Sequence, residues 1–149
     1  MKIAVLFDEE NQHQEADLMK KMKLVHDFSY CGYTIKSKKL NRQLLNIERT
    51  DLFVILVGPS TRFLSSQFID DLKLIINSTK AILCLNLEGM IGLDENHCPK
   101  ILWDCGALHM PFGEENFIFL LNVMKLEDRK AIRTGSFHIR KDPRPYDME

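Results

Sequence analysis

The sequence has no strong charge imbalance and no long apolar run. Its 149 residues carry a formal net charge of -1 at pH 7, so no overall positive field is present to attract nucleic acid or anionic lipid. No apolar run approaches the ~20 residues that a membrane-spanning helix requires. The apolar run at the N-terminus is too short for a signal peptide, and acidic residues follow it. We therefore expect a cytoplasmic protein that binds neither nucleic acid nor membranes.

Closely spaced cysteine pairs are also missing. The four cysteines, Cys31, Cys84, Cys98 and Cys105, are scattered along the chain and lack the CxxC knuckle of structural zinc sites. A chain of this length has an ample core, so the scattered cysteines do not predict a disulfide framework. We expect buried free thiols and no metal ion.

Two common nucleotide-binding motifs are absent. Neither a GxGxxG dinucleotide fingerprint nor a Walker loop occurs. The chain also has no internal repeat and no low-complexity tract, and its length fits one domain. We predict a folded domain over residues 1–126 and a charged C-terminal tail over residues 127–149.

What the chain does contain is a regular alternation of strand and helix patterns. Apolar or β-prone runs predict strands at residues 2–7, 33–35, 52–57, 81–87 and 107–110. Apolar residues at helical spacing lie between them and after the last. The first predicted helix carries Leu18, Met22 and Val25 and ends near Phe28, and the second carries Leu40, Leu44 and Ile47. The third carries Phe68, Leu72, Ile75 and Ile76, and a short helix is predicted at residues 99–103. The last carries Phe117, Leu120, Leu121 and Met124.

This alternation predicts an α/β fold. Parallel strands joined by right-handed helical crossovers form a three-layer open sheet, and five strands favour the flavodoxin-like order 2-1-3-4-5. Such sheets bind ligands at the carboxyl ends of their strands. The loops after the predicted strands are therefore where a site is expected.

Two well-known functions of this fold do not fit those loops. A flavodoxin needs a phosphate-binding loop after the first strand, where this chain has the acidic segment 8–10, which would repel phosphate. A phosphoacceptor receiver needs an Asp at the end of the third strand and a Lys at the end of the fifth. Gly58-Pro59 and Pro111-Phe112 stand there instead.

A Gly-Pro-Ser-Thr loop follows the third predicted strand, at residues 58–61. The next helix carries Ser65, Phe68 and Asp71 at the spacing Ser-x-x-Phe-x-x-Asp. Later landmarks follow in order: Asn-Leu-Glu-Gly at 86–89, Cys98-Pro99 and Gly106-Ala107. Together these residues resemble the bacterial TIR-like family. Its members are small flavodoxin-like relatives of Toll/interleukin-1 receptor domains and include the NAD-processing sensors of Thoeris anti-phage defence.

The resemblance implies that the domain binds NAD or a related nucleotide and cleaves or cyclises it. Asp71 falls on the family's catalytic Glu, where a carboxylate stabilises the oxocarbenium character of the breaking glycosidic bond. It keeps the charge with one methylene fewer, and Gln67 replaces the family's Trp. The pocket residues implied by the resemblance are Phe7, Asp8, Ser60, Thr61 and Ser65.

The resemblance leaves a second function open, in which the site is catalytically degenerate. The domain would then act through self-association or by docking on another protein of a TIR pathway. Residue chemistry offers local interpretations as well. The negative charge of Asp71 would interact favourably with the positive end of its helix dipole. Ser65 would cap the same helix through its hydroxyl, and Phe7 would belong to the core.

Overall fold

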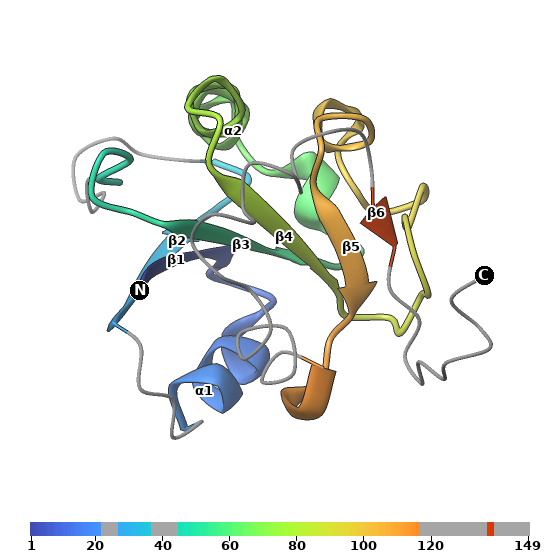
Figure 1. Cartoon of the computed structure of the whole chain (residues 1–149). Coiled ribbons are helices and arrows are strands. Elements are labelled where there is room, and N and C mark those ends of the chain that lie inside the picture. The colour runs from blue at the N-terminus through green and yellow to red at the C-terminus, as the bar shows by residue number, and fades with distance from the viewer. Residues whose placement is uncertain (22–26, 37–44, 117–136, 139–149) are drawn as a thin grey trace, which may run out of the picture.

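A parallel sheet forms the centre of the protein (Figure 1). The computed structural model describes residues 1–21, 27–36, 45–116 and 137–138. Within these residues the strands follow the order β2-β1-β3-β4-β5-β6, and all neighbours are parallel. The strands are β1 (Lys2–Asp8), β2 (Asp27–Tyr33), β3 (Leu52–Val57), β4 (Ala81–Asn86), β5 (Leu108–Pro111) and the two-residue β6 (Phe137–His138). The predicted order 2-1-3-4-5 is confirmed, and β6 extends it beside β5.

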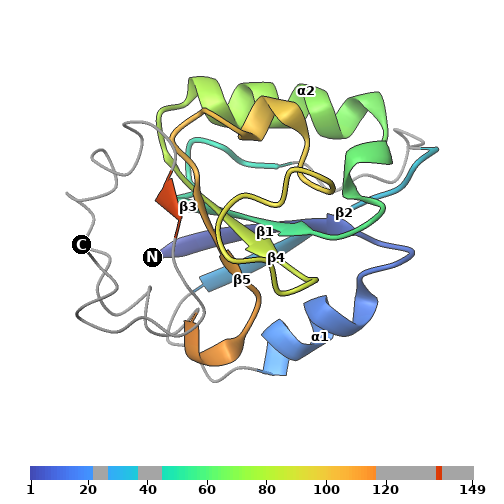
Figure 2. The same ribbon diagram turned by 90° about the vertical axis from the view of Figure 1, so that its right-hand side faces the viewer.

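Helices lie on both faces of the sheet, which gives the three predicted layers (Figures 1 and 2). Helix α1 (His13–Lys21) covers one face, and α2 (Ser66–Asn77) covers the other. Two short 3-10 helices, η2 (Thr61–Phe63) and η3 (Lys100–Leu102), lie in the loops after β3 and β4. The sheet is therefore enclosed from both sides.

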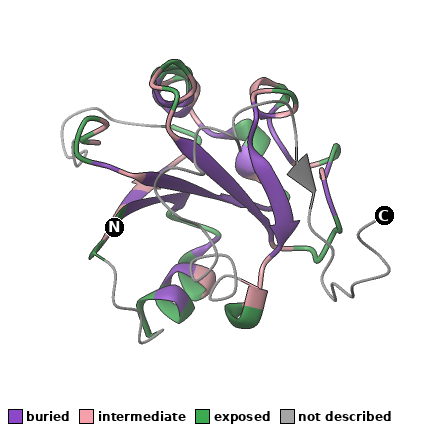
Figure 3. Cartoon of the chain, viewed as in Figure 1, coloured by how far each residue is buried: buried purple, intermediate pink, exposed green. Residues whose placement is uncertain are grey.

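Strands β3 and β4 are buried along their whole length (Figure 3). Because successive side chains alternate between faces, each strand contributes to two separate cores. Leu52, Val54 and Leu56 pack on the α1 side, whereas Phe53 and Ile55 pack on the α2 side. Burial on both faces explains why β3 is apolar throughout and β4 is apolar up to Asn86, with no polar residue in alternation.

The prediction for the first helix was wrong at its end and in its buried face. Phe28 lies in β2, where it is the register partner of Ile3, so the helix does not reach it. Leu18 is 53% exposed, while Ala16 and Met19 face the core. Phe28 pairs with β1 although its spacing from the preceding apolar residues suits a helix, because tertiary contacts outweigh weak local preferences.

The second strand also begins earlier than predicted. It spans Asp27–Tyr33 and lies next to β1 at the end of the strand order, which confirms its position at a sheet edge. Ile35, predicted as a strand residue, follows in a turn and is 51% exposed.

Several predictions lie outside the described residues. They include Met22 and Val25 of the first predicted helix, Leu40 and Leu44 of the second, Phe117, Leu120, Leu121 and Met124 of the last, and the tail apart from β6. Ile47, assigned to the second helix, lies in a turn. Across the described residues, the helices are too short or too polar to cross a membrane.

Candidate functional site

A crevice of about 460 Å³ opens at the carboxyl end of the sheet. It lies beside β1 and β3, between which the strand order reverses, and this is the usual ligand position in open α/β sheets. Its volume is within the range of small-molecule sites. The loops after β1, β3 and β4 and the first turn of α1 line it with Asn11, Gln12, Glu15, Pro59, Ser60, Phe63, Leu87 and Glu88.

Asp8, the last residue of β1, organises the loop behind this crevice. Its Oδ1 accepts hydrogen bonds from the amides of Glu10 at 2.9 Å and Asn11 at 3.2 Å. Its Oδ2 accepts one from the Asn11 side chain at 2.9 Å and one from the Ser60 hydroxyl. Burial opposes the charge on Asp8, but the hydrogen bonds from Asn11 and Ser60 and from the two amides outweigh it, so the pKa of Asp8 is lowered.

Gln12 joins this loop to the one after β3. Its Oε1 accepts from the amide of Asp8 at 2.7 Å, and its Nε2 donates to the Thr61 hydroxyl oxygen at 3.0 Å. That oxygen also accepts from the amide of Gly58 at 2.9 Å, and the hydroxyl donates to the carbonyl of Leu56 at 3.2 Å. Thr61 is fully buried, so its hydroxyl bonds to the loops of the protein and not to a ligand. We call Asp8, Gln12, Ser60 and Thr61 the polar hub.

Gly58 lies where these loops approach each other closely. A Cβ at this position would lie 3.1 Å from Nε2 of Gln12 and 3.2 Å from Cδ1 of Leu87. Both distances are tighter than ordinary van der Waals contact, so a larger residue would require Gln12 and Leu87 to shift by a few tenths of an ångström.

The crevice wall itself is acidic. Glu15 and Glu88 line it, and none of its described lining residues is basic. Oε2 of Glu15 is buried, and no described residue donates a hydrogen bond to it. Phe63 adds an aromatic ring that is 58% exposed. The wall thus offers hydrogen-bond acceptors and one ring face.

The structure places the predicted pocket residues at different depths. Ser60 lines the crevice, while Asp8 and Thr61 lie behind it in the hub. Phe7 belongs to the core on the α1 side and packs edge-to-face against His13, with ring centroids 6.5 Å apart. Its predicted core role is confirmed.

Asp71 and Ser65 do not line the crevice. Asp71 is 2% exposed, and its carboxylate accepts hydrogen bonds from the Tyr33 hydroxyl at 2.5 Å and from Nε2 of Gln67 at 3.1 Å. Tyr33 in turn packs against Phe68. Ser65 occupies the N-cap position of α2, but its hydroxyl makes no capping hydrogen bond. The predicted capping bond was therefore wrong.

Sequence reasoning missed Gln12, Glu15 and Phe63. Asn11 and Gln12 follow three acidic residues and read as part of a solvated loop, and Glu15 begins a polar helix. No local pattern distinguishes them, because their roles depend on the loop after β3 folding against the end of β1.

A second group of chemically reactive side chains lies on the α2 side of the sheet. Cys84, Cys98 and His109 are buried, and their ligating atoms all lie within 4.8 Å of one another. The scattered cysteines predicted no metal site, and no sequence pattern links Cys84 to Cys98 or to His109. The structure instead brings together residues from two strands and a loop.

No protein-family model matches the chain, and no curated protein matches it either. The proposed function therefore rests on the geometry of the crevice and on the TIR-like resemblance.

Proposed function

We propose that this domain binds a ribose-containing nucleotide, NAD or a related molecule, in the crevice beside β1 and β3. The observation that carries the proposal is an acidic wall in which no described residue donates a hydrogen bond to Oε2 of Glu15, and which Ser60 also lines. A buried acceptor without a donor is costly. The hydroxyl groups of a ribose would supply the missing donor.

The charge of the wall favours NAD over simple phosphates. Glu15 and Glu88 repel anions but attract the cationic nicotinamide ring and accept from ribose hydroxyls. The pyrophosphate would face solvent, and a base would stack on Phe63. In this arrangement Asp8 positions Ser60 and does not itself contact the ligand.

Binding without rapid cleavage is the function that the geometry supports best. The resemblance gives the catalytic carboxylate to Asp71, but Tyr33 and Gln67 already occupy that carboxylate and it is almost fully buried. A carboxylate must contact the ribose to stabilise a developing oxocarbenium ion. Cleavage would therefore require Tyr33 to move away from Asp71.

A titration with NAD tests the binding proposal. We expect Glu15→Gln and Ser60→Ala to weaken binding about ten- to a hundredfold, the value of one hydrogen bond to a charged or polar group. Asp17→Asn is the matched control, because it removes a charge from the exposed part of the same helix. Equal affinity in Glu15→Gln, Ser60→Ala and the wild type would refute the site.

Nicotinamide release separates binding from cleavage. We expect slow or no release by the wild-type protein, and Asp71→Asn to leave NAD affinity unchanged. Rapid release that Asp71→Asn abolishes would instead establish the enzymatic function that the resemblance implies.

One observation favours the second function, self-association or partner docking. Met90 and Ile91 are exposed apolar residues in the loop after β4, next to Glu88 of the crevice. Exposed apolar clusters of this kind mark interaction surfaces. Sedimentation at rising protein concentration, with Ile91→Asp as the variant, tests it: an assembled state that the variant loses supports docking, and a monomer at all concentrations refutes self-association.

A further inference from the structure

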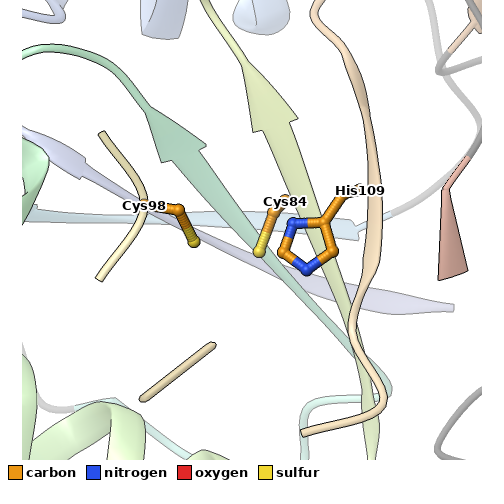
Figure 4. Close-up of side chains that lie close together, drawn as sticks. All are labelled: Cys84, Cys98 and His109. Carbon is orange, nitrogen blue, oxygen red and sulfur yellow. The ribbon is translucent and has the colours of Figure 1, made fainter. Parts of the chain in front are cut away.

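Cys84 and His109 are direct neighbours on adjacent strands. They are register partners in the parallel pair β4 and β5. The residues that flank each of them along the strand belong to the core on the α1 side, so both side chains point toward the α2 side. Cys98, from the loop after β4, reaches the same place (Figure 4).

The backbone around Cys98 is held in place by hydrogen bonds. Its amide donates to the carbonyl of Asp94 at 2.8 Å, and its carbonyl accepts from the indole of Trp103 at 2.9 Å. Nδ2 of Asn86 donates to the carbonyl of Met90 at 2.9 Å and so holds the start of the same loop against the end of β4. These hydrogen bonds fix the position of Cys98, although it lies in a loop and not on a strand.

The donor set is characteristic of one class of metal ion. Two thiols and an imidazole are ligands for Zn²⁺, which binds them tetrahedrally at about 2.3 Å from sulfur and 2.0–2.1 Å from nitrogen. Ligand atoms around one such ion lie roughly 3.5–3.8 Å apart. The three atoms here lie within 4.8 Å of one another, so inward rotations of the side chains would complete the geometry.

Zinc in structural sites is four-coordinate, so the group needs a fourth ligand. Cys105, which follows η3, is the candidate from the chain, but its thiol donates to the carbonyl of Leu102 at 3.6 Å and is not among the atoms that lie within 4.8 Å of one another. Cys105 would have to turn away from Leu102 to bind the same ion, and a water molecule is the alternative fourth ligand.

We propose that Cys84, Cys98 and His109 bind one Zn²⁺ ion. The ion links β4, β5 and the loop between them, which also carries Leu87 and Glu88 of the crevice wall. It acts as a structural centre, because its three ligands are buried in the core and do not line the crevice. This site is independent of the nucleotide proposal and can be tested without any nucleotide.

Cobalt is the probe of choice for the test. The full chain, purified with reduced thiols and stripped of metal, is titrated with Co²⁺, whose thiolate charge-transfer and tetrahedral d–d absorption bands report the ligand set. We expect both bands at one Co²⁺ per chain, and their loss when one equivalent of Zn²⁺ is added. A folded, reduced wild-type protein that shows no thiolate band and binds no Zn²⁺ would overturn the proposal.

Variants then assign the ligands. We expect Cys84→Ser, Cys98→Ser and His109→Gln each to weaken Zn²⁺ binding at least a hundredfold, and Cys105→Ser to weaken it less. Cys31→Ser is the matched control, because Cys31 is a buried cysteine of the same core outside the cluster. Circular dichroism identifies any variant that fails to fold. Unchanged Zn²⁺ binding in folded Cys84→Ser or Cys98→Ser would refute the assignment, as would an equal loss in Cys31→Ser.

Discussion

The polar hub and the cysteine–histidine cluster are both built between neighbouring parts of the sheet, but they use different chemistry. In the hub, Asp8 and Thr61 receive hydrogen bonds from the protein's own amides and side chains. In the cluster, Cys84, Cys98 and His109 bring three soft donors together. The difference teaches that the protein completes the hub by itself, whereas the cluster has the composition of a site completed by an ion.

Metal removal is expected to have the largest effect on this comparison. With free Zn²⁺ at about a thousandfold its dissociation constant, the bound ion would contribute about 4 kcal/mol to the free energy of unfolding. We expect a chelator to remove that amount from the wild-type protein and nothing from Cys84→Ser, as measured by urea denaturation. Equal losses in both proteins would mean that the chelator does not act through the cluster.

Deleting the hub's carboxylate should come next in size. Asp8→Ala leaves the amides of Glu10 and Asn11 and the Ser60 hydroxyl without their acceptor, and we expect a loss of about 3 kcal/mol in the free energy of unfolding. The control Asp17→Ala, on the exposed face of α1, should change it by less than about 0.5 kcal/mol. Similar values for the two variants would show that the hub is not a source of stability.

A methyl group at position 58 should disturb the hub without removing any of its polar atoms. Gly58→Ala places a Cβ 3.1 Å from Nε2 of Gln12, and we expect a cost of about 1–2 kcal/mol. Gly113→Ala is the matched control, because a Cβ there would meet Nδ2 of Asn116 at an ordinary 3.6 Å. A crystal structure of Gly58→Ala in which Gln12 has shifted away from Thr61 would identify the mechanism.

The smallest effect is the titration of Asp8. Its pKa is lowered in the folded protein, so its contribution to stability is complete above the unfolded value of about 3.9 and is lost as the pH falls through the folded value. We expect the stability difference between wild type and Asp8→Asn to be constant near neutral pH and to shrink below about pH 4. A difference that grows on acidification would contradict the sign of the shift.

The local predictions succeeded where pattern and burial agree. The third strand was predicted at its observed bounds, since six apolar residues in a row have one compatible position in a sheet covered on both faces. Helix α2 was likewise predicted from Phe68, Leu72 and Ile75, which all face the core. The prediction for the first helix was wrong at its end because Phe28 pairs with β1 as part of β2, and local residue spacing does not reveal strand pairing.

The candidate site was harder to predict than the fold. Ser60 was found because its loop follows a clear central strand, and it does line the crevice. Glu15 and Gln12 carried no signal, since polar residues at the start of a helix are common for many reasons. Cys84 was not linked to Cys98 and His109 because it is separated from them in the sequence and no short ligand spacing connects the three.

The sequence by itself determined the layers and the strand order, because apolar periodicity and right-handed crossovers act on neighbouring segments. Only the tertiary structure decided which polar side chains meet. Cys84 faces His109 through the register of two strands, and Asp8 meets Ser60 through the contact of two loops. Register and loop contact depend on packing across the whole sheet, and no short stretch of sequence contains that information.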